Sequence, residues 1–105
     1  MHIDLDNPEG PIWNLCVRYR GVVYATRRMT YMELVSGQQM TRAKPFKPAP
    51  MRKLIASLFA GNARPDVDAM PGELLLAVFV AASGEYFRMA TAASLIAIHA
   101  KKFGP

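Results

Sequence analysis

From residue 12 to residue 20 the side chains alternate between apolar and polar, and this alternation restricts the fold of the chain more than any other feature. Successive side chains of a β-strand point to opposite faces, so the segment predicts a strand with one apolar face. The apolar face carries Trp13, Leu15, Val17 and Tyr19, and the opposite face carries Asn14, Cys16, Arg18 and Arg20.

A second strand-like run, residues 22–29, follows directly after Gly21. If Arg20 and Gly21 form a two-residue turn, the two segments pair as an antiparallel hairpin over residues 12–29. The predicted pairs are Tyr19–Val22, Val17–Tyr24, Leu15–Thr26 and Trp13–Arg28. A lone hairpin is only marginally stable in water, so another element must cover its apolar face. Residues 3–5 or a strand of a partner could extend the hairpin.

The next residues, Thr30-Tyr31-Met32-Glu33, have the spacing of a capping box. The Thr30 side chain can accept a hydrogen bond from the Glu33 backbone, and the Glu33 side chain can accept one from the Thr30 backbone. We therefore expect the second strand to pass into a short helix over residues 30–37, with Gly37 at its end.

Residues 41–50 contain three prolines and three basic residues, which predicts an extended, exposed joint. A helix is then expected to begin at Pro50 or Met51 and to end at residues 61–62. Its apolar stripe follows the helical spacing i, i+3, i+4, i+7 and i+8. The stripe consists of Met51, Leu54, Ile55, Leu58 and Phe59.

Residues 71–102 are nearly all good helix formers, which predicts either one long helix or two helices divided near Ser83 and Gly84. The whole chain of 105 residues is the size of one domain. The predicted class is α+β: a hairpin (12–29), a capped helix (30–37), a basic joint (41–50) and a helical part (51–103), with three to four helices in all.

The chain lacks the residue patterns of an enzyme or a metal protein. One cysteine excludes an internal disulfide, and His2 and His99 lie near opposite ends without a metal-binding spacing. We expect no catalytic residue, no cofactor and no metal, and we expect Cys16 to be a buried structural thiol. The uncharged apolar run at residues 74–84 is too short to cross a bilayer, so no membrane association is predicted.

The net charge of +5 and the isoelectric point of about 9.7 favour polyanionic partners. The candidate polyanion contacts are Arg18, Arg20, Arg27, Arg28, Lys44 and Lys47. A nucleic-acid platform needs aromatic and basic side chains on one face. The alternation instead puts the tyrosines on the Trp13 face, away from Arg18 and Arg27. We therefore interpret the arginines mainly as a solvated face, and a small nucleic-acid-binding or regulatory protein remains the alternative.

The segment VRYRGVVYATRRMTYMELVSG, residues 17–37, resembles the N-terminal part of small tail-assembly chaperones and related tail or baseplate accessory proteins of bacteriophages. In those proteins a hairpin with a glycine turn and a following arginine runs into a Thr-x-x-Glu-Leu helix start. The proline-rich joint and the alanine-rich C-terminal half are similar too. The chain departs from the family in charge, because such chaperones are often acidic.

The resemblance implies a non-enzymatic structural or interaction protein in a multi-subunit assembly, namely a phage tail or baseplate component in the virion or the host cytoplasm. Its partners would be other protein subunits, including copies of itself. The candidate contact residues are Trp13, Tyr24, Phe46, Phe59 and Phe79.

Overall fold

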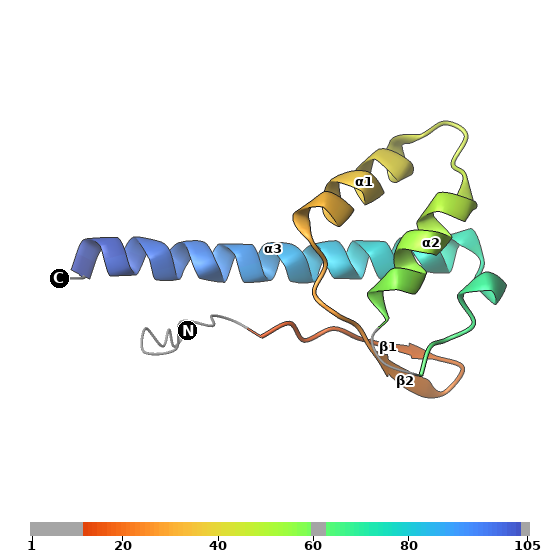
Figure 1. Ribbon diagram of the computed structural model, residues 1–105, viewed down its shortest axis with the longest axis horizontal. Coiled ribbons are helices and arrows are strands. Elements are labelled where there is room, and N and C mark those ends of the chain that lie inside the picture. The colour runs from red at the N-terminus through yellow and green to blue at the C-terminus, as the bar shows by residue number, and fades with distance from the viewer. Residues whose placement is uncertain (1–11, 60–62, 104–105) are drawn as a thin grey trace.

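The computed structural model describes residues 12–59 and 63–103, and the side chains up to residue 92. The elements, in chain order, are β1 (Cys16–Tyr19), β2 (Val22–Ala25), α1 (Tyr31–Arg42), α2 (Pro48–Leu58), the short 3₁₀-helix η1 (Val67–Ala69) and α3 (Gly72–Phe103). The predicted class is confirmed: one α+β domain in which an N-terminal hairpin is followed by three α-helices (Figure 1). The strand suggested for residues 3–5 lies outside the described residues.

The hairpin has the predicted register at its turn, where Tyr19 pairs with Val22 and Val17 with Tyr24. Arg20 and Gly21 have φ angles of 51° and 80°, which is the left-handed conformation that a two-residue hairpin turn requires. The strands are shorter than predicted.

The predicted pairing of Trp13 with Arg28 is wrong, because the chain after β2 pairs with the end of α2 instead. Thr26 forms an antiparallel bridge with Phe59, and the Arg27 backbone N–H donates to the Leu58 carbonyl at 2.8 Å.

Helix α1 begins with the predicted capping box but does not end at Gly37. The predicted end is wrong because Gly37 serves helix packing: a Cβ at this position would overlap the ring of Phe79 on α3. The glycine therefore lets α1 and α3 approach closely, and α1 continues to Arg42.

Helix α2 begins at Pro48, earlier than predicted, because both Pro48 and Pro50 lie in its first turn, where a helix tolerates proline. The joint between α1 and α2 is thus only residues 43–47. The predicted stripe is confirmed for Met51, Leu54, Ile55 and Leu58, which form the buried face of α2, whereas Phe59 is buried but lies just after the helix. The predicted end at residues 61–62 is wrong: the helix ends at Leu58, because Phe59 is already extended and forms a bridge with Thr26.

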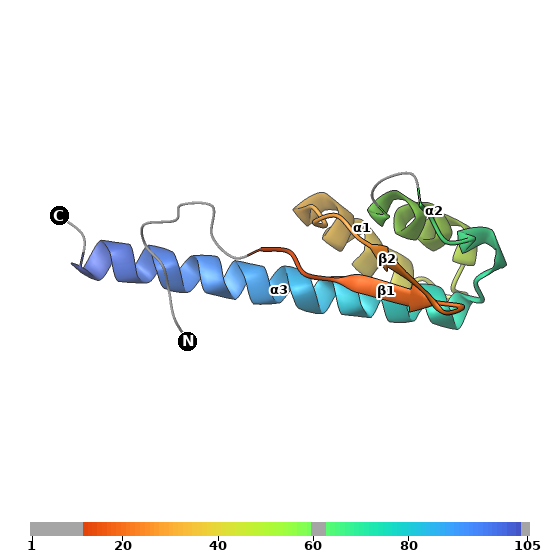
Figure 2. The ribbon, with the colours of Figure 1, turned by 90° about the horizontal axis from the view of Figure 1, so that it is seen from below.

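Helix α3 is one continuous helix, which decides between the two readings of residues 71–102. Ser83 does not interrupt it, since its hydroxyl donates to the Phe79 carbonyl one turn earlier at 2.8 Å. The other elements pack around the first half of α3, and the second half projects beyond them (Figures 1 and 2). The radius of gyration is accordingly 16.2 Å, against about 13 Å expected for a compact chain of this length.

The core lies where the first half of α3 meets α1, α2 and the hairpin. It contains Met29, Leu34, Met51, Leu54, Ile55, Leu58, Phe59, Val67, Met70, Leu75, Val78, Phe79 and Ala82. The apolar face of the hairpin packs against this core through partly buried side chains such as Trp13, Leu15 and Val17.

Candidate protein–protein interface

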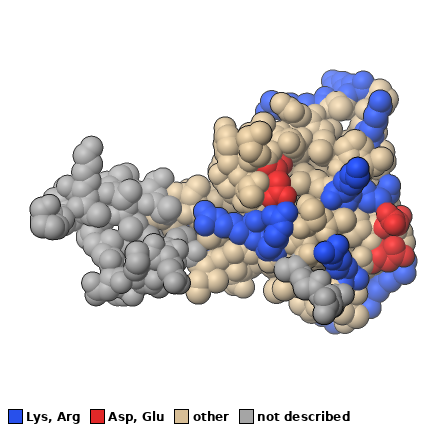
Figure 3. Space-filling model, in the orientation of Figure 1, with Lys and Arg blue, Asp and Glu red and all other residues tan. Residues whose placement is uncertain are grey.

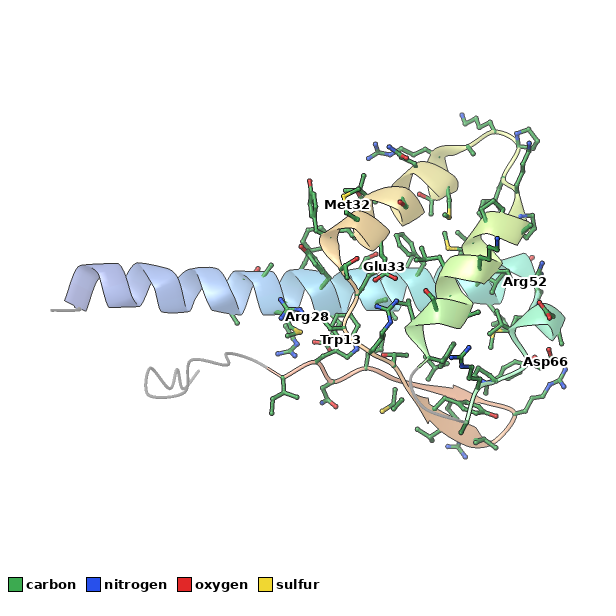
Figure 4. The ribbon with its side chains drawn as sticks, viewed as in Figure 1. Trp13, Arg28, Met32, Glu33, Arg52 and Asp66 are labelled. Atoms are coloured by element: carbon green, nitrogen blue, oxygen red, sulfur yellow. The ribbon has the colours of Figure 1, made fainter. Side chains whose placement is uncertain are left out.

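Arg27 lies in the segment between β2 and α1 and binds residues of both α1 and α2. Its guanidinium forms a bidentate ion pair with Glu33, with Nη1 donating to Oε1 at 2.9 Å and Nη2 to Oε2 at 2.6 Å. Its Nε donates to the Ser57 carbonyl near the end of α2 at 2.9 Å. Glu33, which is labelled in Figure 4, also accepts a hydrogen bond from the Thr30 backbone N–H at 2.9 Å. Arg27 is therefore a structural residue, although the sequence placed it among the polyanion candidates.

Glu33 should make the stability of the fold sensitive to acid. The hydrogen bond from Arg27, helped by those from Thr30, lowers the pKa of Glu33 from its ordinary value of 4.5 to about 2. A carboxyl whose folded pKa is depressed stabilises the fold above its unfolded pKa, and this contribution is lost as the pH falls through the folded value. We expect Glu33→Gln to cost about 1–2 kcal/mol at pH 7, after allowance for solvent screening of the partly exposed pair.

Chemical denaturation at pH 7, 4 and 2 checks this expectation. The difference between wild type and Glu33→Gln should shrink between pH 4.5 and pH 2, because the wild-type carboxyl becomes protonated in that window. Asp66→Asn, which alters an exposed carboxylate, is the matched control. A difference that stayed constant from pH 7 to pH 2 would contradict the role given to the ion pair.

Arg52 is a second arginine with a structural role. Its Nε donates to the Val67 carbonyl at 3.3 Å, and its Nη2 donates to the Met70 carbonyl at 3.1 Å. The side chain thereby ties α2 to the segment before α3 (Figure 4). No local sequence pattern indicates the distant carbonyl groups that Arg52 binds.

The remaining basic candidates do not gather into one patch. Arg18 and Arg20 are exposed on the hairpin, where Arg20 lies over the Tyr19 ring at 5.1 Å. Lys44 and Lys47 are exposed between α1 and α2, on the other side of α2 from the hairpin in Figure 1. In the view of Figure 3, the Lys and Arg side chains form separate groups. Arg28 is exposed just before α1.

The five aromatic contact candidates divide into two sets. Phe59 and Phe79 are core residues, 2% and 4% exposed, so little of either ring remains for a partner. Trp13, Tyr24 and Phe46 are partly buried against the core. The Trp13 indole donates to the Thr26 hydroxyl at 2.9 Å, and the Tyr24 ring meets that of Phe59 edge to face at 6.1 Å.

Cys16 is exposed on the hairpin, so the prediction of a buried thiol is wrong. The reason is that only the Trp13 face of the hairpin packs on the core, and Cys16 lies on the opposite face.

The solvent side of α3 carries an apolar surface that the sequence analysis did not single out. We call it the α3 face; it consists of Leu74, Ala77, Val80, Ala81, Gly84 and Phe87, with Glu73 and Arg88 at its two ends. Leu74, Val80 and Phe87 are 41%, 67% and 51% exposed. A helix of a monomeric soluble domain usually carries polar residues on this side. The sequence signal was present, because no charged residue occurs between Glu73 and Glu85.

A groove of about 270 Å³ runs between β1 and the α3 face. Its walls include Cys16 and Arg18 of the strand and Leu74, Ala77 and Ala81 of the helix. The groove is continuous with the α3 face because these three helix residues belong to both. A side chain that docks on the α3 face can therefore also enter the groove.

No family model, no curated protein and no solved structure matches this chain. Among the residues that the structure describes, no three His, Cys, Asp or Glu side chains gather where they could hold a metal ion. The candidate site is therefore defined by surface shape and polarity alone.

One helix segment, Gly72–Ala92, is long and apolar enough to cross a membrane by length and composition, with a mean hydropathy of 1.3 and 28% of the segment buried. The same segment supplies Leu75, Phe79 and Ala82 to the core. A membrane-spanning arrangement of this segment would remove those side chains from the domain, so it is incompatible with the fold described here.

Proposed function

We propose that this protein is a non-enzymatic interaction protein that assembles with other protein subunits through the α3 face. The observation that carries the proposal is the exposure of Leu74, Val80 and Phe87 along one uncharged side of a long helix. Contiguous exposed apolar surface of this kind marks interaction sites in soluble proteins. Burial of the face against a partner would remove that surface from water, which supplies the main driving force for association.

The biological setting that we propose is the assembly of a bacteriophage tail or baseplate, in the host cytoplasm or in the virion. This part of the proposal is supported by the resemblance of residues 17–37 to tail-assembly chaperones and tail accessory proteins. Much of that resemblance depends on the capping box and on Arg27, which pairs with Glu33 at the start of α1. A protein bound to an acidic partner subunit would also suit the net charge of +5.

Nucleic-acid binding is the alternative function. The exposed basic residues favour it, but Arg27 is engaged within the chain and the other candidates lie on two sides of α2. If the alternative holds, the double variant Arg18→Glu/Arg20→Glu should weaken binding to DNA or RNA and reduce the salt dependence of that binding.

The test of the proposed function is co-expression of the chain with the products of its neighbouring genes, followed by purification after nuclease treatment. We expect a stoichiometric complex with at least one neighbour or with a second copy of the chain. Val80→Glu should abolish it, because a carboxylate would be buried in an apolar interface. Gln39→Glu, which adds the same charge on the exposed side of α1, is the matched control and should leave the complex intact.

Two outcomes would overturn the proposal. One is a chain that forms no complex with any neighbouring product and stays monomeric in light scattering. The other is a chain that retains nucleic acid at low salt, releases it at high salt and shows no protein partner, which would favour the alternative.

A further inference from the structure

The α3 face is complementary to itself when it is reversed end for end. It has an acid, Glu73, at one end and a base, Arg88, at the other, and it has bulky and small residues at mirrored positions between them. We propose that its partner is the α3 face of a second copy of this chain, with the two helices antiparallel. The inference rests on the proposed function and names the partner of the same surface.

An antiparallel pair centred level with Ala82 matches large residues to small ones. Residues at equal distances on either side of the centre then face each other across the two-fold axis. Val80 faces Gly84 of the second copy, and Ala77 faces Phe87 of the second copy. Alternation of large and small side chains across facing positions is the arrangement that lets two helices interdigitate closely.

The charges select the antiparallel direction. Glu73 and Arg88 are about 22 Å apart along the helix axis. An antiparallel pair therefore brings Glu73 within about one helical turn of Arg88 of the second copy, at both ends of the contact. A parallel pair would instead place Glu73 beside Glu73 and Arg88 beside Arg88, which is unfavourable.

Arg88 is already held at the edge of the α3 face. Its Nε forms a hydrogen bond with Glu85, and its Nη2 donates to the Ile12 carbonyl at 2.8 Å. These bonds use two of its three nitrogens and leave Nη1 to donate to Glu73 of the second copy. Its side chain remains 51% exposed, so the carboxylate can reach it.

No contact within the described part of one copy requires a glycine at position 84. A Cβ at Gly84 would meet nothing within 4 Å, whereas a Cβ at Gly37 would overlap Phe79. Glycine destabilises the middle of a helix relative to alanine, so its presence at an open surface position has no benefit within one copy. In the antiparallel pair it provides the space that Val80 of the second copy occupies.

The groove beside β1 gives Phe87 a place to bury its ring. Phe87 of the second copy faces Ala77, which lines the groove of about 270 Å³ together with Leu74 and Ala81. The two-fold axis creates this contact twice, once in each copy. A half-exposed aromatic ring in one copy thus becomes a buried anchor at each end of the pair, as is typical of interface hot spots.

The first experiment is light scattering on the nuclease-treated full chain over a wide range of concentration. We expect a mass of twice 11.6 kDa at high concentration. Val80→Glu should weaken the self-association by at least about tenfold, since it places two carboxylates in one apolar contact. Gln39→Glu should leave it unchanged.

Single cysteines introduced in a Cys16→Ala background test the direction of the helices. In the antiparallel pair, position 81 of one copy lies within about 3 Å of position 81 of the second copy along the helix axis. Ala81→Cys should therefore form an interchain disulfide on mild oxidation. Position 87 of one copy lies about 15 Å from position 87 of the second copy, so Phe87→Cys alone should not form an interchain disulfide. A mixture of Ala77→Cys and Phe87→Cys should form the mixed disulfide.

Each other result overturns the inference. If the chain is monomeric at every concentration, its α3 face does not bind a second copy. A disulfide between two Phe87→Cys chains would show that the two helices are parallel. Flotation of the chain with phosphatidylcholine–phosphatidylglycerol vesicles, lost in Val80→Glu, would show that lipid covers the α3 face. If the chain were a monomer and still formed a complex with a neighbouring gene product that depends on Val80, the inference of self-association would be wrong. The proposed function would then still hold.

Discussion

Phe59→Ala is expected to lower the free energy of unfolding by about 3–5 kcal/mol, the range found when a buried aromatic residue is truncated. Phe59 is 2% exposed, meets Tyr24 edge to face and forms a backbone bridge with Thr26. Its removal would open a cavity between α2 and the hairpin. Because small domains are stable by only about 5–15 kcal/mol, this loss removes a large part of the stability of the chain.

Urea denaturation followed by circular dichroism measures this effect. The matched control is Tyr31→Ala, whose ring is 63% exposed at the start of α1, and which should change stability by no more than about 0.5 kcal/mol. The same comparison separates a core role of Phe59 from a role as a partner contact. If Phe59→Ala left the stability of the chain intact and weakened only its association, the core assignment would be wrong.

Gly37→Val is expected to cost about 2–3 kcal/mol, the upper part of the range for overpacking a well-filled core. A side chain at this position would displace the ring of Phe79, which is 4% exposed and enclosed between α1 and α3. The matched control is Gly84→Val. It places the same side chain on an open part of α3 and should change monomer stability by less than about 0.5 kcal/mol at low protein concentration.

The double variant Gly37→Val/Phe79→Ala decides whether the contact is direct. Removal of the ring makes room for the new side chain, so the double variant should be more stable than the sum of the two single effects by about 1 kcal/mol or more. Purely additive effects would mean that Gly37 is needed for some reason other than the approach of the two helices.

The candidate interface was only partly predictable from the sequence. By helical spacing, Leu75, Val78, Phe79 and Ala82 share one side of α3, and that side is the buried one. The residues of the exposed side are also apolar, and helical spacing cannot tell which of two apolar sides faces a core. The aromatic candidates show the same ambiguity: Phe59 and Phe79 are large and apolar, as a contact residue would be, but both are buried in the core of their own chain.

The sequence by itself determined the features that depend on near neighbours. The hairpin turn at Arg20 and Gly21, the capping box of Thr30 and Glu33 and the stripe of α2 each follow from steric or hydrogen-bonding preferences within a few residues. These preferences are local, so a short segment contains all the information that they need.

Only the tertiary structure decided the features that depend on distant partners. It decided that Gly37 lies inside a helix, because Phe79 requires the space, and that Arg27 and Arg52 bind groups far along the chain. It also decided which side of α3 remains exposed, since burial depends on how the hairpin, α1 and α2 pack around the helix. The physical reason is that packing and long-range hydrogen bonds join residues whose separation in the sequence carries no signal of their proximity in space.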